Sequence, residues 1–373
     1  MDSTYLENPN LTSASPTGLT NQIQYSHDES VVQAIALTLI MFAAISLNTI
    51  NLLIVIRNSV MQNPRYMFIM NLVCGDLGVS LLSMPFSLAT TVYREWVFGF
   101  ELCKLHGFLG SVFFCASLFT MAVMSVEQYY LLVKPLSRVI TVRRAWHIMA
   151  AVWALSALIS IGPVIGWGHF GYNSSTLACG IAYPKTAFER LYLLMLVAIA
   201  FVTPLIVMAY VYVRILFAVR AHSQRIAKYS SGCSEVIALQ QRITYTLLLV
   251  LIIFLLCWTP FVCLVVFASL NSDVHHLPYG LGVAAYWCGY FNSACNPIIF
   301  IIRNDRFRDG YKEIFTALRY FVQCRNRSKN LRRRSLSLND ICYVNRTCDN
   351  FAGKTDSFKH FHDTKQPVNA GLI

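Results

Sequence analysis

Seven long apolar stretches dominate this sequence and decide what kind of protein it can form. They lie at about 31–56, 67–92, 103–133, 146–168, 191–216, 243–270 and 278–301. A helix needs about 20 mostly apolar residues to cross a bilayer. Only 13% of the residues are charged and 56% are hydrophobic, which argues against a soluble or a disordered chain. The sequence therefore predicts an all-α membrane protein, with a seven-transmembrane helix bundle over residues 31–303.

Basic residues between the stretches predict how the chain crosses the membrane. One side carries Arg57, Arg65, Lys134, Arg138, Arg143, Arg144, Arg220, Arg225, Lys228 and Arg242, whereas the other carries Arg94, Lys104, Lys185 and Arg190. Loops rich in Lys and Arg stay in the cytoplasm. We therefore expect a multi-pass plasma-membrane protein with an extracellular N-terminal segment, 1–30. The net charge of +12 is spread over separate loops, which indicates contact with membrane lipid rather than nucleic acid.

The C-terminal region begins with an amphipathic pattern. Within residues 304–322 the apolar positions fall at helical spacing on one face: Phe307, Tyr311, Ile314, Phe315, Leu318 and Val322. This pattern predicts a helix that lies on the membrane surface. Residues 323–373 are polar and basic without periodicity, so we expect a disordered cytoplasmic tail.

Several short motifs predict covalent modification. Asn10 and Asn173 stand in glycosylation motifs on the predicted outer side, while the same pattern at Asn326 and Asn345 falls inside and is attributed to chance. Cys324 is either a palmitoylation site or an ordinary thiol. Ser335 and Ser337 follow three arginines and are candidate phosphorylation sites.

Polar residues inside the apolar stretches are the strongest functional signal. Two acids, Asp76 and Glu127, lie within them. An ionisable side chain at membrane depth is costly and usually functional, although a hydrogen bond between packed helices is the plainer alternative. A carboxylate surrounded by hydroxyls and amides suits a small hard cation and water. The residues that could converge in this way are Asp76, Asn48, Ser117, Asn292, Ser293 and Asn296.

The order of these and other motifs resembles that of the rhodopsin-like (class A) G-protein-coupled receptors. The markers are Asn48, Asn71-Leu72 with Asp76, Cys103, Glu127-Gln128-Tyr129, Trp153, Pro204 with Tyr212, Cys257-Trp258-Thr259-Pro260 and Asn296-Pro297-Ile298-Ile299-Phe300. The resemblance covers about residues 30–322. It implies a receptor that passes an extracellular signal to heterotrimeric G proteins, with arrestin as a further partner.

The resemblance also implies roles for individual residues. Cys103 and Cys179 resemble the outer disulfide of the family. Asp76, Ser117, Asn292, Ser293 and Asn296 resemble its allosteric sodium site, which favours the inactive state. The resemblance implies that Leu118, Pro204 and Phe254 pack together as a connector between helices. Trp258, one turn outward of Phe254, would form the floor of the ligand cavity or serve only in packing. Pro260 and Pro297 would kink their helices.

Two residues depart from the family pattern at the cytoplasmic switch. Gln128 replaces the arginine of the acid–Arg–aromatic motif, and Phe300 replaces the tyrosine that could bridge to Tyr212. Gln128 cannot make a charged pair with Glu127, so we expect Glu127 to be free to protonate or turn elsewhere. The acid expected at the foot of the sixth span is Gln240. These changes predict either a weakly restrained inactive state with high basal activity or poor G-protein coupling.

Ligand chemistry is limited by what the sequence lacks. Tyr290 stands where opsins carry the retinal-binding lysine, so no covalent cofactor is expected. Gly110 stands where aminergic receptors carry an aspartate, so an anchor for a charged amine is missing there. We expect the outer cavity to be lined by His106, Gly110, Tyr192, Trp258, Trp287 and Tyr290, although His106 is equally suited to a helix end. The stretches 71–86 and 119–138 resemble orphan members of the family, which identifies no ligand.

Three classes of function compete. The first is the receptor described above. The second is an enzyme or an ion carrier, but the sequence contains no metal-ligand cluster, nucleophile–base pair or phosphate loop at a usable position. The third is a seven-span scaffold or receptor partner that does not activate G proteins, which Gln128 keeps open. The receptor class explains most of the motifs.

Overall fold

The computed structural model describes residues 27–134, 140–229, 234–270 and 279–333, without the side chains of 27, 60, 219, 222–229, 234–244, 247, 279 and 324–333. Its helices are α1 His27–Arg57, α2 Pro64–Leu82, α3 Met84–Tyr93, α4 Phe100–Val133, α5 Val142–Ser160, α6 Ala187–Val197, α7 Thr203–Tyr229, α8 Ser234–Leu270, α9 Tyr279–Arg303 and α10 Asp305–Arg333. Short helical turns are η1 Ser59–Met61, η2 Gly162–Val164 and η3 Ala198–Val202, and the strands are β1 Phe170–Asn173 and β2 Ala178–Ile181.

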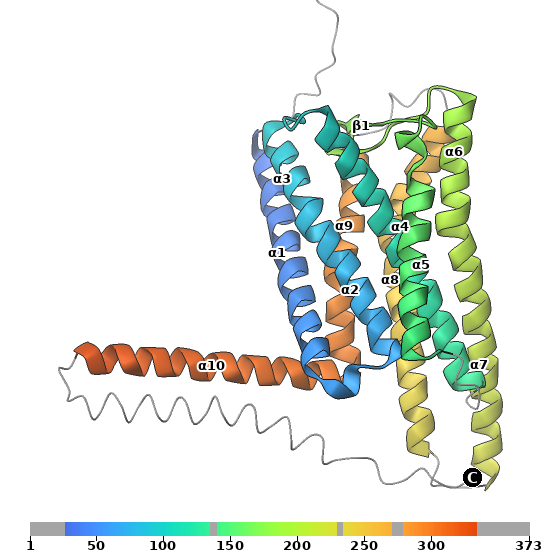
Figure 1. The fold of residues 1–373 in the computed structure, drawn as a ribbon, viewed down its shortest axis with the longest axis vertical. Coiled ribbons are helices and arrows are strands. Elements are labelled where there is room, and N and C mark those ends of the chain that lie inside the picture. The colour runs from blue at the N-terminus through green and yellow to red at the C-terminus, as the bar shows by residue number, and fades with distance from the viewer. Residues whose placement is uncertain (1–26, 135–139, 230–233, 271–278, 334–373) are drawn as a thin grey trace, which may run out of the picture.

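Helices α1 to α9 form seven columns, because α2 continues into α3 and α6 continues through η3 into α7 (Figure 1). Within the described residues, five segments are long and apolar enough to span a membrane: Asp28–Arg57, Pro64–Tyr93, Phe100–Val133, Ala187–Ala218 and Leu248–Leu270. Large apolar side chains such as Phe42, Leu158 and Leu256 point outward and are about 70% exposed. Such a surface requires an apolar environment. The predicted seven-helix membrane bundle is confirmed.

Proline and capping signals explain the ends of the second column. Asn63 caps α2 by accepting a hydrogen bond from the Tyr66 backbone N–H at 3.4 Å, and Pro64 begins the helix. The column, predicted as one span over 67–92, is interrupted at Ser83. Pro85 has no N–H to donate to the preceding turn, so the helix restarts as α3.

The fifth column, predicted as one helix, contains a π-helical turn. Ala198–Val202 forms this turn and ends two residues before Pro204, and the Thr203 hydroxyl donates to the Ala198 carbonyl at 2.9 Å. A proline removes one helical hydrogen bond, and a wider turn accommodates the loss.

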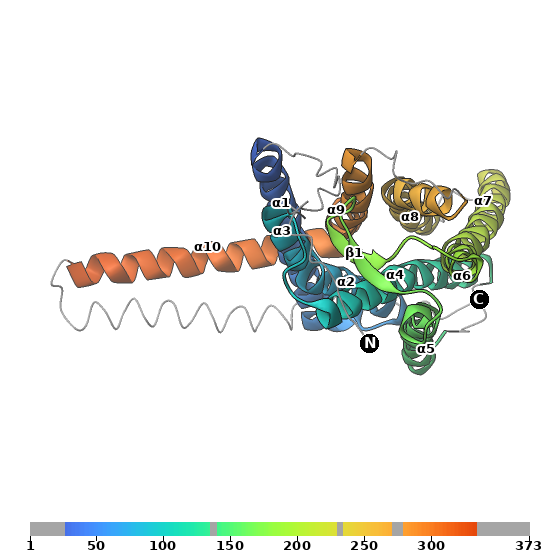
Figure 2. The ribbon, with the colours of Figure 1, turned by 90° about the horizontal axis from the view of Figure 1, so that it is seen from above.

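A short β-hairpin, which the all-α prediction did not include, crosses one end of the bundle. β1 and β2 pair antiparallel with Tyr172 opposite Cys179. Seen from above, the hairpin lies over the space between α9, α4 and α6 (Figure 2). Below, this end is called the hairpin end and the opposite one the α10 end. The fourth column, predicted to reach 168, gives way after Ser160 to η2 and the chain leading into the hairpin.

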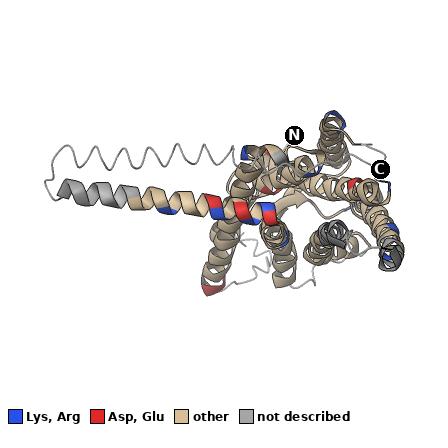
Figure 3. Ribbon diagram, turned by 90° about the horizontal axis from the view of Figure 1, so that it is seen from below, with Lys and Arg blue, Asp and Glu red and all other residues tan. Residues whose placement is uncertain are grey.

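α10 runs across the bundle axis and projects sideways from the bottom of α9 (Figure 1). Its first turns dock on the bundle, where Phe307 stacks on Phe300 at 5.7 Å and the Tyr311 hydroxyl donates to the Leu47 carbonyl at 3.0 Å. Acidic and basic residues alternate on this part of α10 (Figure 3). Phe315, Leu318 and Val322 remain exposed, as a membrane-surface helix requires. The helix continues to Arg333, beyond the expected end at 322.

Candidate functional site

A cavity of about 140 Å³ opens beneath the hairpin, between α4, α6 and α8. Gly110 and Phe114 of α4, Ile181 of β2, and Trp258 of α8 are among its walls. None of the lining residues that the structure describes is charged, and the polar ones are Ser111, Asn173, Thr176, Tyr183 and Tyr286 together with Trp258. The indole N–H of Trp258 is buried and has no hydrogen-bond partner within the described part of the chain. The cavity therefore favours an uncharged occupant that can accept a hydrogen bond.

A smaller cavity of about 30 Å³ lies next to the first and contains the buried acid. The two cavities share Gly110, Phe114, Trp258 and Tyr286 as lining residues. The structure brings the predicted sodium-site residues together here: Asp76, Ser117, Asn292 and Ser293 line the cavity, and the Asn296 amide donates to Asp76 at 3.0 Å.

The atoms around this smaller cavity suit a hard cation. The side-chain oxygens of Asn292 and Asn296 are buried and have no hydrogen-bond partner among the described residues. Asp76 is 1% exposed. A carboxylate, two hydroxyls and unpaired amide oxygens form an all-oxygen donor set, which is what small hard cations prefer. The space is sufficient for an ion with a water molecule.

Four aromatic rings connect the cavity floor to the centre of the bundle. Phe114 contacts Trp258 at 4.6 Å and Phe254 at 6.2 Å between ring centroids. Phe201, within the π-helical turn, lies 6.4 Å from Phe114 and 6.5 Å from Phe254. The predicted connector residues Leu118 and Phe254 are fully buried in the same core. The sequence analysis missed Phe114 and Phe201, because an apolar residue in an apolar helix carries no separate signal.

The hairpin is held down as a lid at three points. The predicted disulfide joins Cys103 in the first turn of α4 to Cys179 of β2. His106, one turn along α4, contacts the Cys179 carbonyl through Nδ1 at 2.8 Å and the Ser83 hydroxyl through Nε2 at 3.2 Å. The Tyr172 hydroxyl donates to the Arg94 carbonyl at 3.4 Å, and burial raises the pKa of that hydroxyl. His106 thus serves the lid rather than lining the cavity.

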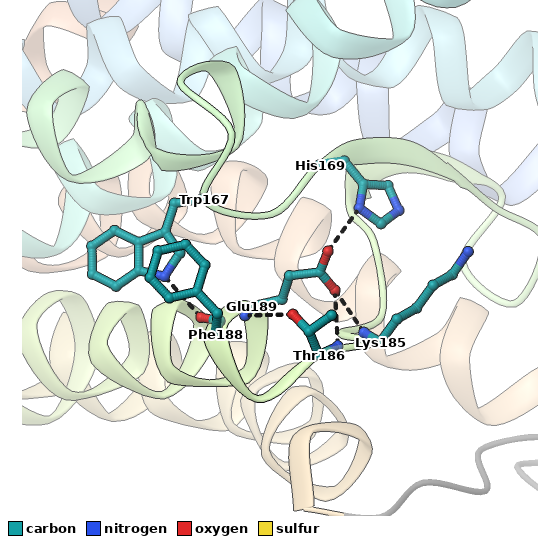
Figure 4. A network of polar contacts seen from close by, with 6 residues as sticks. All are labelled: Trp167, His169, Lys185, Thr186, Phe188 and Glu189. Carbon is teal, nitrogen blue, oxygen red and sulfur yellow. Dashed lines mark hydrogen bonds and ion pairs between the residues drawn. The ribbon is translucent and has the colours of Figure 1, made fainter.

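A network of polar contacts fixes the chain between the hairpin and α6 (Figure 4). The Glu189 carboxylate accepts hydrogen bonds from the backbone N–H groups of Lys185 and Thr186, at 2.6 and 3.3 Å, and lies 3.5 Å from His169 Nδ1. The Thr186 hydroxyl accepts from the Glu189 N–H at 3.2 Å, which completes a capping box. The start of α6, and with it one cavity wall, is therefore set by local hydrogen bonds.

The other aromatic residues expected at the cavity occupy different places. Tyr192 is fully buried and turns towards the end of α5, where its hydroxyl donates to the Ile159 carbonyl at 3.1 Å. The Tyr290 hydroxyl pairs with Ser87 at 2.7 Å, and its ring borders the smaller cavity. Trp287 packs with the cluster around α1 and α9. The direction in which each of these side chains points depends on the rotation of its helix, which cannot be read from the residue type.

At the α10 end, the residues of the expected switch have a partner that the sequence analysis missed. Arg65, at the start of α2, donates from Nη2 to the Gln128 side-chain oxygen at 3.1 Å. The Arg65 Nε also lies 3.7 Å from the Glu127 carboxylate. Of the two alternatives expected for Glu127, protonation or a turn to another partner, the structure shows the second, with Arg65 as the partner. Phe300 stacks on Phe307, so the ring at this position contacts α10.

Some predicted residues lie outside the described part of the chain. These are Asn10, Ser335 and Ser337, and the side chains of Gln240 and Cys324. Asn173 is described, and its half-buried side chain accepts hydrogen bonds from Ser175 at the mouth of the cavity. Glycosylation there stays a prediction. Pro204, Pro260 and Pro297 lie within helices of the bundle, and Tyr212 is buried in its core.

A bundle of membrane-length helices that encloses a cavity under a disulfide-held lid has the architecture of a seven-transmembrane receptor. Residues 47–300 match the family described as "7 transmembrane receptor (rhodopsin family)". The chain belongs to this family.

Individual relatives agree with the family assignment. Human neuropeptide FF receptor 1 is 28% identical over 330 residues, which is 83% of this chain and 77% of that receptor. The GQ-coupled rhodopsin of Mizuhopecten yessoensis is 28% identical over 260 residues, 66% of this chain but 52% of its own length. Among solved structures, squid rhodopsin superposes with a TM-score of 0.73 at 23% identity, covering 79% of this chain and 87% of that one, which supports the fold.

Proposed function

We propose that this chain is a plasma-membrane receptor that converts ligand binding beneath the hairpin into activation of heterotrimeric G proteins. The N-terminus and the hairpin end face outward in this proposal. Its support is the charge distribution: Arg57, Arg65, Lys134, Arg143, Arg144 and Arg303 lie at the α10 end. Basic residues favour the cytoplasmic side.

The observation that carries the proposal is the contact between the ligand cavity and the movable core. Trp258 forms part of the wall of both cavities and packs on Phe114 and Phe254. Two residues beyond Trp258, Pro260 interrupts the hydrogen bonding of α8. A ligand that displaces the indole would shift the packing of Phe254, and α8 has a weak point at which it can swing.

The lining indicates a ligand whose inserted group is neutral and mainly apolar. Burying a charged group in a cavity without a counter-charge is strongly unfavourable. An apolar cavity of about 150 Å³ accommodates benzene, and this cavity has about 140 Å³. The inserted group is therefore about the size of one ring, with an acceptor for the Trp258 N–H. Relatives named as neuropeptide receptors favour a peptide side chain as that group.

A fragment comparison tests this preference. Benzyl alcohol, benzylamine and benzoate have the same ring and differ in charge, so the purified receptor should be stabilised against heat by the alcohol alone. Gly110→Leu would fill the cavity from α4, where a Cβ meets only the Ser83 hydroxyl at 3.8 Å, and should abolish the stabilisation. Equal stabilisation by the charged fragments would contradict the neutral-ligand proposal.

Nucleotide exchange tests the coupling itself. Full-length receptor in lipid nanodiscs should accelerate GTPγS binding by at least one class of purified heterotrimer, compared with empty nanodiscs. A correctly folded receptor that accelerates none of the classes would overturn coupling and favour the scaffold function.

We further propose that sodium binds at Asp76 and stabilises the inactive arrangement. A cation favours whichever helix arrangement binds it better, and this donor set spans α2, α4 and α9. Sodium chloride should raise the unfolding temperature more than choline chloride at equal ionic strength. Asp76→Asn should remove that difference, whereas Glu101→Gln, at an exposed acid of α4, should retain it. A sodium response that survives Asp76→Asn would place the ion elsewhere.

A further inference from the structure

We infer that Arg65 of α2 restrains the α10 end of α4 in place of the arginine that is missing at position 128. The guanidinium group is supplied from the neighbouring helix, and it holds both Glu127 and Gln128 at the α10 end of α4. This inference rests on the proposed function for its signalling consequence, but the ion pair and its contribution to stability do not depend on G-protein coupling.

The distances and the burial of these side chains indicate a structural contact rather than an exposed surface ion pair. Arg65 Nη2 lies 3.1 Å from Gln128 Oε1, and Arg65 Nε lies 3.7 Å from Glu127 Oε2. Glu127 is 6% exposed and Gln128 1% exposed. The Arg65 side chain is 24% exposed, so its charged end is partly withdrawn from water. One guanidinium, with its fixed set of donors, can serve a carboxylate and an amide oxygen together.

The place of Arg65 in its own helix gives a second argument. It is the second residue of α2, after Pro64 and the Asn63 cap. The N-terminus of a helix carries a partial positive charge, so an arginine in its first turn is disfavoured locally. The favourable contacts of Arg65 therefore come from the neighbouring helix, where Glu127 supplies the negative charge.

The consequence concerns which helices the restraint connects. α2 and α4 pack closely along the core, and Asn71 of α2 also donates to Thr120 of α4 at 2.8 Å. Arg65 thus completes an α2–α4 unit and keeps Gln128 turned towards α2. In this receptor, exposure of the α4 end to a cytoplasmic partner requires release of Arg65, in addition to any movement of α8.

A double-mutant cycle with thermal unfolding tests the pair. Arg65→Gln and Glu127→Gln should each lower the unfolding temperature, by about 2–4 °C, and the double variant should be no less stable than the weaker single variant. Arg57→Gln removes an exposed arginine at the same end and should leave the temperature unchanged. Additive losses, or an Arg65→Gln variant as stable as the parent, would overturn the inference.

Relocating the guanidinium distinguishes a switch from local packing. Gln128→Arg alone places a second positive charge beside Arg65 and should destabilise the receptor, whereas Arg65→Gln combined with Gln128→Arg should restore stability. At matched surface display, Arg65→Gln should raise basal signalling and the relocated pair should return it to the parental level. If the parent signals and Arg65→Gln leaves its basal signalling unchanged, the proposed role of Arg65 in switching is overturned. If no variant signals, the proposed coupling fails, while the unfolding cycle still decides the ion pair.

Discussion

At the residue scale, Gly289 of α9 shows how closely the cavity floor is packed. A Cβ at this position would lie 2.9 Å from the Trp258 ring. Gly289→Ala should therefore push the indole towards the cavity and lower the free energy of unfolding by about 1–3 kcal/mol, as overpacking does. Thermal unfolding and Trp258 fluorescence would measure the effect. Gly280→Ala, at an exposed position in the same helix with open space around it, is the control and should be neutral or slightly stabilising. Equal unfolding of the two variants would contradict the close packing.

At the scale of elements, one hydrogen-bonded chain connects three helices. Trp153 of α5 donates to the Asn71 side-chain oxygen at 2.9 Å, and Asn71 donates onward to Thr120 of α4. Trp153→Phe keeps a ring against Phe113 but leaves the Asn71 oxygen without this donor. An unpaired buried acceptor costs about 1–3 kcal/mol, so the unfolding temperature should fall. Trp146→Phe changes a tryptophan of the same helix that is 58% exposed and should have little effect. If both variants unfold like the parent, the chain does not hold α5 in place.

At the scale of the whole molecule, the lid depends on one covalent bond between distant segments. Cys103 and Cys179 are separated by 76 residues. Cys103→Ser and Cys179→Ser should each lower the free energy of unfolding by about 2–4 kcal/mol and reduce surface display. The double variant should be no worse than either single variant, because the first change already breaks the bond. Cys263→Ser, at an exposed free thiol of α8, should behave like the parent. Losses that add between Cys103 and Cys179 would contradict a bond between them.

Local features of the sequence determined the membrane class and the approximate helix spans, and they singled out the residues of the proposed cation site. Apolar length is a property of each segment alone, so the bilayer requirement can be applied without knowing the packing. The residues of the proposed cation site were identified in the same way, because a carboxylate within an apolar stretch such as that around Asp76 is conspicuous by itself. The interruption at Ser83 could have been read from Pro85, but the hairpin could not, because its strands have four residues each.

Only the tertiary structure decided which side chains meet. Arg65 and Gln128 are 63 residues apart, and their contact depends on the rotation and crossing of α2 and α4. The same rotation turns Tyr192 towards α5 and brings Phe114 against Trp258. A single helix contains no information about its own rotation when most of its residues are apolar on every face. The sequence could therefore show that position 128 lacks an arginine, but only the packing of α2 against α4 could show that Arg65 supplies one.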